Sequence, residues 1–540
     1  MLKAEATYEA TCQAFAWKIP ERYNIALDVC DKWADGSGRL ALITEKSPAE
    51  QQRFTFDELK QLSDRFALAL SRHGIAKGDR VGIFLPQALE TAVAHLAIYK
   101  IGAIAVPLFT LFGTAALEFR LADSAAKVLV THQEGLDKLA AIRAALPALE
   151  TVFVIDGAPA ECGALSFWGA LEAESPGFTP VTTAADDPAV IIYTSGTTGK
   201  PKGALHAHRV LPGHLPGVEM SHNFFPERAR LMWTPADWAW IGGLFDVLMP
   251  SWHHGIPVLA CRFAKFDAVH AYDLMSRHGV THSFLPPTAL KMLRSIENPG
   301  ERWPLALVSV ASGGESLGLE LIEWGRRTLG LTINEFYGQT ECNMIVSSCA
   351  ALFPPEIGSM GKAVPGHAIE ILDSSGRPLP PGREGDIAVG VPDPVMFLNY
   401  WQQPAATREK FAGSYLVTGD RGIRDAAGFI RFLGRRDDVI TSAGYRIGPG
   451  PIEDCLLSHA AVEMAAVIGV PDPERTEVVQ AFVVLRDGFA PSEALVRELQ
   501  DHVRRKAGAH EYPRRISFVE ALPMTATGKI MRNRLRAAPP

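Results

Sequence analysis

One segment constrains this chain more than any other: an apolar strand that runs directly into a loop of hydroxyl-bearing and glycine residues. The run Ala189–Tyr193 is apolar, Thr194-Ser-Gly-Thr-Thr-Gly199 follows it, and lysines occupy positions 200 and 202. Glycines let backbone N–H groups turn toward an anion, and hydroxyl and ammonium groups add further donors. The segment therefore predicts a strand followed by a loop that binds a polyphosphate.

The loop differs from the Walker phosphate loop. That motif has four residues between its glycines and a Ser or Thr directly after its lysine. Here two residues separate Gly196 from Gly199, and Pro201 follows Lys200, so no helix continues from the lysine in the Walker manner. A solvated hairpin turn is the alternative interpretation of these residues.

The rest of the chain predicts an α/β fold with more than one domain. The chain has 540 residues, whereas a domain usually has roughly 100–200. Strand-like apolar runs alternate with helical runs, a rhythm that predicts βαβ units and largely parallel sheets. The strand runs are 80–86, 104–109, 127–131 and 151–156, with helical runs at 87–101, 135–146, 268–278 and 287–295.

The composition changes twice toward the C-terminus. After about Gly358, glycine and proline become dense and short strands such as 385–390 follow, which is typical of β-rich structure. A small α/β unit is expected beyond Gly434-Arg-Arg-Asp-Asp438. We therefore expect a large N-terminal domain over residues 1–436, with packed βαβ sheets and a β-rich subdomain, and a small mobile α/β domain over residues 437–540.

Charge and cysteine usage limit the classes of partner and the location. With 53 basic and 60 acidic residues the net charge is −7, which argues against nucleic acid as the principal partner. Seven cysteines without paired spacing favour a reducing compartment. The N-terminal residues lack the apolar run of a signal peptide, and no apolar stretch reaches the ~20 residues that span a bilayer. We expect a cytoplasmic protein without a transmembrane segment.

Seven motifs, in order along the chain, resemble those of the adenylate-forming superfamily, which includes acyl- and aryl-CoA synthetases, luciferases and peptide-synthetase adenylation domains. They are Tyr193–Gly203, Ser312–Glu315, Glu335–Glu341, Tyr415–Asp420, Gly434–Asp438, Ser442–Gly448 and Pro523–Lys529. Together they cover about residues 190–530. The chain looks most similar to medium-chain acyl-CoA synthetases and benzoate-type CoA ligases.

The resemblance implies an ATP-dependent carboxylate–CoA ligase. Such an enzyme forms an acyl-adenylate and pyrophosphate, then an acyl-CoA and AMP, with ATP, Mg²⁺ and coenzyme A as cofactors and a small carboxylic acid as substrate. All of these reactants are anions, so the site must neutralise charge and hold an in-line geometry. Adenylation for a carrier protein or another acceptor, and nucleotide binding without catalysis, are the alternatives.

The resemblance also assigns residues to roles. Lys529 is implied to bridge the carboxylate and the α-phosphate, Thr340 to donate to that phosphate, and Glu341 to bind Mg²⁺, a cation that takes carboxylate together with phosphate oxygens. Asp420 would hold the ribose hydroxyls, with Arg435 beside it. The implied nucleotide-binding set is Thr194, Ser195, Gly196, Thr197, Thr198, Gly199, Lys200, Lys202, Gly313, Gly314, Glu315, Glu335, Phe336, Tyr337, Asp420 and Arg435.

A second group of residues is implied for thioester formation. In the family the small domain rotates about a hinge between the two half-reactions, a rearrangement that brings a second face to the site. By resemblance Asp437 is the hinge, and Gly444 and Arg446 belong to the face that admits coenzyme A. Acylation of Lys529 by a lysine acyltransferase, reversed by a deacylase, would remove its charge. A homo-oligomer is left open.

The acid is expected to be longer or bulkier than acetate. The family's acetate enzymes have a Trp at the position of Gly338, and each further buried methylene contributes about 0.8 kcal/mol. The segment that contains Trp238 and Trp240 resembles the part of the family fold that lines the acyl pocket. Plain core packing is the alternative for both indoles, and more so for Trp240, so Trp238 is the candidate for this role. An aromatic lining suits an aliphatic tail as well as a flat ring.

Overall fold

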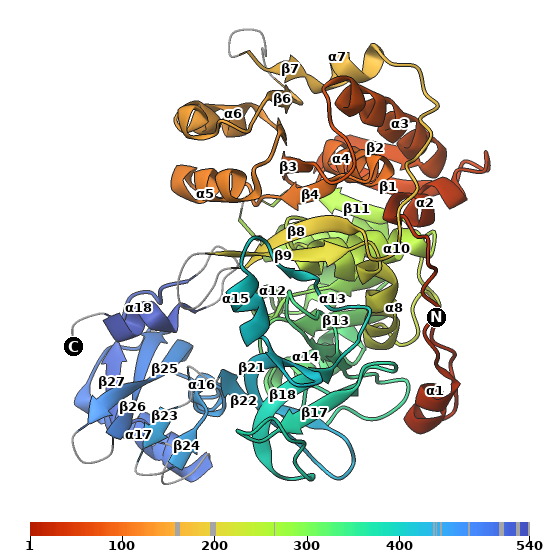
Figure 1. Cartoon of the computed structure of the whole chain (residues 1–540). Helices are drawn as coiled ribbons and strands as arrows, with labels where there is room; N and C mark the ends of the chain where they lie inside the picture. The colour runs from red at the N-terminus through yellow and green to blue at the C-terminus, as the bar shows by residue number, and fades with distance from the viewer. Residues whose placement is uncertain are drawn as a thin grey trace.

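A computed structural model of the chain describes residues 1–156, 163–194, 201–263, 265–435, 438, 440–442, 445–472, 476–506, 512–524 and 530–537. Figure 1 shows layers of sheet and helix, with a smaller α/β unit at the C-terminal end, drawn in blue. The predicted α/β class, with a large sheet-containing part and a small C-terminal unit, is confirmed.

Two large sheets form the larger part of the chain, and both are parallel in their centres. The first is antiparallel at one end only, and the second at both ends. One has the order β19 (Asn399–Tyr400), β9 (Lys202–Ala207), β8 (Pro188–Thr194), β4 (Ile104–Pro107), β3 (Arg80–Phe84), β5 (Val128–Thr131), β6 (Thr151–Val154) and β7 (Leu165–Ser166). The other has the order β16 (Lys362–Ala363), β15 (Val346–Ser347), β14 (Asn334–Tyr337), β13 (Ser309–Gly313), β12 (His282–Phe284), β10 (Met232–Trp233), β11 (Val258–Cys261), β1 (Leu40–Ser47) and β2 (Glu50–Thr55).

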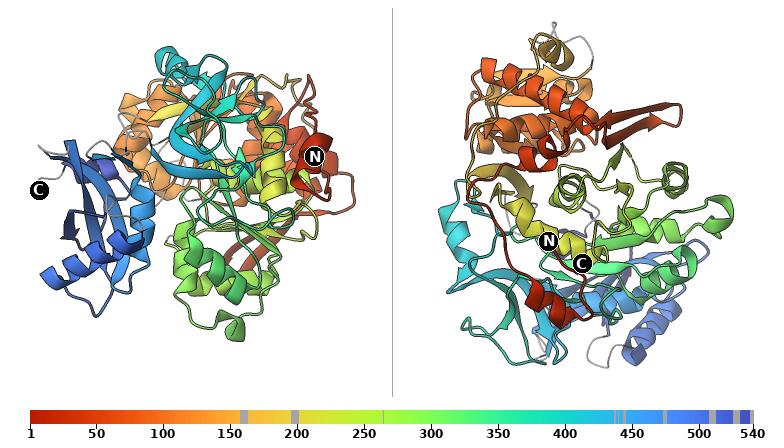
Figure 2. Two further views of the ribbon diagram at one scale, coloured as in Figure 1. Left: turned by 90° about the horizontal axis from the view of Figure 1, so that it is seen from below. Right: turned by 90° about the vertical axis from the view of Figure 1, so that its right-hand side faces the viewer.

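Two smaller sheets follow. The β-rich part contains β17 (Ile369–Leu372), β18 (Glu384–Gly390), β20 (Phe411–Ala412), β21 (Tyr415–Arg424) and β22 (Ile430–Arg435). The C-terminal unit contains β23 (Ile440–Ser442), β24 (Tyr445–Ile447), β25 (Val462–Asp472), β26 (Thr476–Leu485) and β27 (Arg515–Phe518). The chain therefore changes sheet between Arg435 and Ile440, the interval that includes the predicted hinge position. Figure 2 shows this unit projecting to one side of the larger part.

Helices cover the faces of these sheets. Those of the larger part are α1 (Tyr8–Ala14), α2 (Ile25–Val29), α3 (Phe56–Arg72), α4 (Leu89–Ile101), α5 (Thr114–Ser124), α6 (Gln133–Ala140), α7 (Phe167–Glu172), α8 (Val210–Ser221), α9 (Ile241–Gly243), α10 (Met249–His253), α11 (Ala268–His278), α12 (Pro287–Arg294), α13 (Pro299–Arg302), α14 (Leu319–Trp324) and α15 (Pro404–Glu409). Those of the C-terminal unit are α16 (Pro449–Leu457), α17 (Glu493–Lys506) and α18 (Arg532–Ala537). Short 3₁₀ turns η1 (Asp31–Trp33) and η2 (Arg143–Ala145) and π-helical turns η4 (Leu244–Leu248) and η5 (Gly325–Leu329) complete the helical elements with printed bounds.

Helix α4 illustrates how the core differs from the simplest sequence expectation. A surface helix is apolar on one face, but nearly every side chain of α4 is buried, as in a helix with apolar residues on all sides. Its one lysine, Lys100, is buried because Nζ lies 2.6 Å from Asp64 Oδ1 and 2.9 Å from Asp31 Oδ1. Pairing of this kind is what permits a charge in a core.

Local signals account for several helix boundaries. Helix α3 begins with a capping box, in which Thr55 Oγ1 accepts from the Glu58 backbone N–H and the Glu58 carboxylate accepts from the Thr55 backbone N–H. Helix α11 begins at the capping carboxylate of Asp267 and ends at Gly279, which has a φ of +64°. Among the described residues, no helix combines the length and the apolar composition needed to span a membrane.

Candidate active site

A cavity of about 2560 Å³ lies where all four sheets approach one another. Pockets for one small ligand typically have about 300–1,000 Å³, so this cavity has room for more than one reactant. Its lining draws on the first sheet (Tyr193, Thr194, Lys202), the second (Gly313–Glu315, Glu335–Glu341), the third (Asp420, Arg435) and the C-terminal unit (Glu453, Asp454, Arg532).

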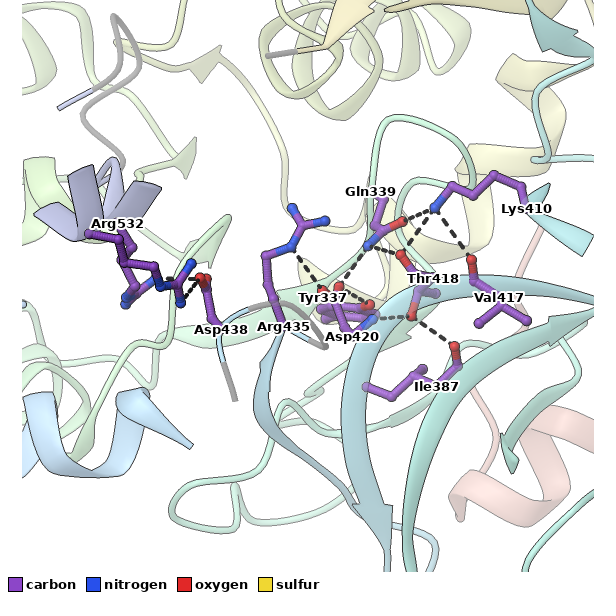
Figure 3. Close-up of polar contacts among 11 residues, drawn as sticks. Tyr337, Gln339, Ile387, Lys410, Val417, Thr418, Asp420, Arg435, Asp438 and Arg532 are labelled. Atoms are coloured by element: carbon purple, nitrogen blue, oxygen red, sulfur yellow. Dashed lines mark hydrogen bonds and ion pairs between the residues drawn. The ribbon is translucent and has the colours of Figure 1, made fainter. Parts of the chain in front are cut away.

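The Asp420 carboxylate lies on the wall of this cavity and contacts three other polar side chains. It is buried, with 5% of its surface exposed. Its Oδ2 atom accepts two hydrogen bonds of 2.6 Å, one from the Tyr337 hydroxyl and one from the Gln339 side-chain amide (Figure 3). Tyr337, predicted to present its ring to adenine, lines the cavity and also holds the carboxylate through its hydroxyl.

Arg435 lies on the other side of Asp420. Strand pairing aligns the two residues, since Asp420 of β21 is opposite Arg435 of β22, and Arg435 Nε is 3.8 Å from Asp420 Oδ1. Burial raises the pKa of Asp420 above its usual range, while the bond from Tyr337 and the Arg435 charge oppose that rise. A partly shielded carboxylate beside a guanidinium suits polar recognition of a hydroxylated ligand.

Lys410 fixes the orientation of this network, although nothing in the sequence motifs pointed to it. Its Nζ donates to Gln339 Oε1 at 3.2 Å and to the Thr418 and Val417 carbonyl oxygens at 3.0 and 3.3 Å (Figure 3). Because a lysine can only donate, it holds the carbonyl end of the Gln339 amide and leaves the NH₂ end for Asp420. The signal available in the sequence was only a lysine five residues before the strand that contains Asp420.

Glu341 is connected to the phosphate-loop hairpin through Tyr400. Glu341 is 8% exposed and lines the cavity, and its Oε1 atom accepts from the Tyr400 hydroxyl. The Lys202 ammonium lies 5.0 Å from the centroid of the Tyr400 ring, within range of a cation–π interaction. Thr340, next to Glu341, is partly exposed and also lines the cavity.

The described residues fit a magnesium site that depends on phosphate. They contain no group of three or more His, Cys, Asp or Glu that could hold a metal by themselves. Mg²⁺ commonly takes one or two carboxylates, with substrate phosphate oxygens and water as its other ligands. Glu341 on the cavity wall matches that donor set.

The turn after β13 is shaped by glycine. Gly313 pairs with Phe336 across β13 and β14, and a Cβ on Gly313 would lie 2.5 Å from the Phe336 ring. Gly314 has a φ of +98°, in the region that favours glycine. Glu315 follows at the half-buried end of the turn. Close by, burial raises the pKa of Glu335 to about 8.

The apolar end of the cavity contains Phe109, Trp240, Ile241 and Phe284. Trp240 contacts Phe109, with ring centroids 5.4 Å apart. Trp238, the indole favoured from the sequence for this role, does not line the cavity and is 1% exposed in the main core. The two indoles are separated by one residue and face different surroundings, so Trp240 takes the place expected of Trp238.

Gly338 lines the cavity, but the absence of a Trp side chain at this position does not open space in the acyl pocket. A Cβ built on Gly338 would lie 1.7 Å from the Asn343 carbonyl oxygen and 2.8 Å from the Met344 nitrogen. No side chain fits there without displacement of backbone. The glycine is needed for the close approach of two chain segments, and the expectation that residue 338 sets the pocket size is not supported by this geometry.

Several sequence-predicted residues lie outside the part of the chain that the structure describes. These are Ser195, Gly196, Thr197, Thr198, Gly199, Lys200, Asp437, Gly444 and Lys529. For Arg446 the structure gives only the backbone, in β24. Their neighbours are described: Thr194 pairs with Lys202 at the base of the β8–β9 hairpin.

The residues that follow position 529 are anchored by charge. Arg532 donates to Glu453 at 2.6 and 2.8 Å, and Arg536 lies 2.8 Å from Asp438. Figure 3 places the Arg532–Asp438 pair apart from the Asp420 network, across the cavity lining. These pairs join α18 to α16 and to the segment where the chain changes sheet.

Comparisons with known proteins give a consistent result over nearly the whole chain. The model of the AMP-binding enzyme family matches residues 30–401, and that of the AMP-binding enzyme C-terminal domain matches residues 451–529. A mitochondrial acyl-coenzyme A synthetase of Mus musculus is 34% identical, over 98% of this chain and 93% of its own length. An acetyl-coenzyme A synthetase of Bacillus subtilis is 35% identical, over 98% of this chain and 94% of its own length.

A solved structure agrees with these matches. The anthranilate CoA ligase AuaEII, in complex with anthranoyl-AMP, superposes with a TM-score of 0.88 at 30% identity and covers 96% of this chain and 98% of its own. The predicted resemblance and the predicted class, an acid–thiol ligase that uses ATP, Mg²⁺ and coenzyme A, are confirmed. The cytoplasmic location stays a prediction, because the mouse relative is mitochondrial by name.

Proposed function

This chain belongs to the AMP-binding enzyme family, and on that premise we propose that it joins a carboxylic acid bulkier than acetate to coenzyme A. The acid would first take the adenylyl group of ATP, with release of pyrophosphate. The coenzyme A thiol would then displace AMP. Medium-chain and aromatic acids are the class proposed, in line with the relatives that act on anthranilate and on acyl groups.

The single observation that supports this proposal is the continuity of one cavity across three chemical environments. The network of Asp420, Tyr337 and Gln339 can hydrogen-bond to a sugar. Glu341 and Lys202 carry opposite charges near the phosphate-loop hairpin. Phe109, Trp240 and Phe284 form an apolar end. Thr340 also lines the cavity. A carboxylate whose tail occupied the apolar end would thus approach the phosphate-binding residues.

The proposed division of labour follows the chemistry of each group. Asp420 and Arg435 would hold the ribose, Thr340 and Lys529 would bind oxygens at the reacting phosphorus, and Glu341 would bind Mg²⁺, which neutralises phosphate charge when bound. Gly444 and Arg446 would form the face for coenzyme A after rotation about Asp437. Residues 1–436 and 437–540 are proposed as the two units of that motion.

The size of the acid is argued from the apolar end. Four large side chains surround it, and burial of a methylene contributes about 0.8 kcal/mol, or roughly fourfold in affinity. Acetate has one methyl group and would leave most of this surface unused. A tail of several carbons or an aromatic ring would cover it.

The test is a panel of acids from C2 to C12, together with benzoates, assayed for AMP and pyrophosphate. The proposal expects both products only when ATP, Mg²⁺, acid and coenzyme A are present, with kcat/KM for the best acid at least about tenfold above that for acetate. ADP as product would refute the adenylate route. Transfer to a carrier protein but not to free coenzyme A would favour the alternative acceptor, and acetate as the best acid would refute the size argument.

Two finer expectations belong to this proposal. Acylation of Lys529 would abolish adenylate formation, because the amide has no charge. Mass spectrometry of the Lys529 peptide from cells, with activity measured before and after deacylation, tests this. Fractionation of cells that produce the chain tests the expected cytoplasmic location.

A further inference from the structure

The proposed chemistry does not use Asp246, an acidic side chain of the cavity lining near the apolar end. Asp246 lies in the π-helical turn η4, between α9 and α10, and turns of this kind often occur at functional sites. It lines the cavity although only 2% of its surface is exposed. A Cβ on Gly242, one turn earlier, would lie 3.1 Å from Phe284 Cε1 and 3.4 Å from Asp246 Oδ2. Oδ2 is therefore close to the aromatic wall.

The two carboxyl oxygens of Asp246 have different surroundings. Oδ1 accepts a hydrogen bond of 2.7 Å from the Asn343 side-chain amide, and Asn343 is two residues beyond Glu341 in the motif loop. Oδ2 has no donor within hydrogen-bond distance among the described residues. Burial raises the pKa of Asp246 well above its usual range, so the carboxyl is neutral and can donate or accept a hydrogen bond at Oδ2. A polar ligand group there would be preferred over a C–H group.

His214 adds a second acceptor rather than a donor. Its Nδ1 atom is 3.2 Å from the Val210 carbonyl oxygen, which can only accept, so Nδ1 carries the proton. Burial lowers the pKa of His214 well below its usual range, which keeps the ring neutral and leaves Nε2 as a lone pair 3.4 Å from Asp246 Oδ1. Acceptor atoms thus outnumber donor groups around this carboxyl.

We propose that the Asp246 carboxyl forms a hydrogen bond through Oδ2 with a hydroxyl or amino group of the acid, which makes the preferred substrate a hydroxy- or amino-substituted carboxylic acid. The inference rests on the proposed function and narrows its substrate class. Asp246 is a specificity-determining residue in this scheme and takes no part in adenylyl transfer. The substituent is at a distance from the reacting carboxylate, because Asp246 lies among the aromatic side chains of the apolar end.

The experiment compares matched acids with the full-length chain. The acids are benzoate with its 2-, 3- and 4-hydroxy and amino derivatives, and hexanoate with 6-hydroxyhexanoate, each assayed for pyrophosphate release with ATP, Mg²⁺ and coenzyme A. In the unaltered chain at least one substituted acid should exceed its parent about tenfold or more in kcat/KM. Asp246→Leu should reduce this ratio to about twofold or less, because kcat/KM for the substituted acid falls more than kcat/KM for the parent acid.

Two further variants keep the test decisive. Asp246→Ala removes both carboxyl oxygens with a side chain smaller than leucine, so the ratio should fall at least about threefold even if the leucine variant fails to fold. Ser251→Ala alters a buried side chain of α10 outside the cavity lining, and should leave the ratio unchanged. A merely structural role for Asp246 would lower kcat/KM for parent and substituted acids alike and leave their ratio unaltered.

The outcomes separate the two proposals. No pyrophosphate with any acid would overturn the proposed function. Pyrophosphate released equally well with parent and substituted acids, or a substituent preference that survives in Asp246→Ala, would overturn this inference and leave the ligase assignment standing.

Discussion

The side-chain amide of Gln339 donates a hydrogen bond of 2.6 Å to Oδ2 of Asp420, and Lys410 holds the other end of that amide at 3.2 Å. The three residues come from the motif loop, from strand β21 and from the segment after α15. A lysine outside every recognised motif thus sets the direction in which a motif glutamine donates. The carboxylate proposed for the ribose depends on this arrangement.

The Lys410→Met variant tests this dependence. Without the ammonium group the oxygen of the Gln339 amide loses its donor, and only the Thr418 carbonyl, which accepts from Nε2 at 2.9 Å, and Asp420 still orient the amide. We expect KM for ATP to rise about tenfold, equivalent to ~1.4 kcal/mol, with KM for the acid changed less than about twofold. Lys138 also donates to a backbone carbonyl, at 2.9 Å, but lies outside the cavity lining, so Lys138→Met is the matched control. An equal rise in both KM values would contradict the assignment of Asp420 to the nucleotide.

The hydroxyl of Tyr400 is expected to orient Glu341 for magnesium. In Tyr400→Phe, Glu341 loses the only hydroxyl that donates to it among the described residues. We expect kcat to fall about tenfold and the Mg²⁺ concentration for half-maximal rate to rise, since outer partners of a metal ligand typically contribute 10- to 100-fold. Tyr272→Phe removes a buried hydroxyl that donates to the Leu293 carbonyl away from the cavity, and serves as control. An unaltered Mg²⁺ titration would mean that Glu341 is not the metal ligand.

The sequence predicted the fold better than the surroundings of the site. Helix α11 spans the predicted range 268–278, because an aspartate cap and a terminal glycine mark its ends. Strand runs such as β5 and β6 were found because their residues are buried on both faces and apolar throughout. These signals are local in the chain, which is why they can be recognised without a structure.

The misplaced and missed residues depend on contacts between distant segments. Trp238 and Trp240 have the same side chain and nearly the same neighbours in sequence, so only packing decides which one faces the cavity. Tyr400 reaches Glu341 because β19 pairs with β9 at the edge of a sheet. Asp246 belongs to none of the seven motifs, and only the fold brings it beside Asn343.

Lys529→Ala is expected to separate the two half-reactions. Adenylate formation should fall at least about 100-fold, because a cation at the developing charge is lost, while thioester formation from synthetic acyl-AMP should change less than about threefold. Arg534→Ala, which alters an exposed side chain of α18, is the control. Equal losses in both steps, in a variant whose thermal unfolding matches the parent, would disprove the assignment of Lys529 to adenylation alone.

Titration of Glu335 should make the free energy of unfolding depend on pH. Burial, with a contribution from the nearby Asp454 charge, raises its pKa from 4.5 to about 8. Between those two values the folded chain binds more protons than the unfolded chain, so the free energy of unfolding falls as pH rises, by up to ~1.4 kcal/mol per unit for this group. Glu335→Gln should therefore flatten the decline of Tm between pH 5 and about 8, and Glu297→Gln, at an exposed position, should not. Identical pH profiles for the parent and Glu335→Gln would show that Glu335 is charged in the folded chain.

The size of the acyl site should be set at Gly242, not at Gly338. A Cβ on Gly242 meets the tip of the Phe284 ring at 3.1 Å, a contact that a small ring movement relieves, so Gly242→Ala narrows the apolar end and keeps the backbone in place. We expect kcat/KM for the bulkiest accepted acid to fall at least about tenfold, with propionate changed less than about threefold. Gly338→Ala brings its Cβ within 1.7 Å of a backbone oxygen, so all acids should lose activity together and Tm should drop by several degrees, as expected for ~2 kcal/mol or more in a chain of this size. If Gly338→Ala instead changed the chain-length preference at an unchanged Tm, the loop from Gly338 to Asn343 would be able to move and accommodate a side chain. Residue 338 would then help to set the size of the acyl site.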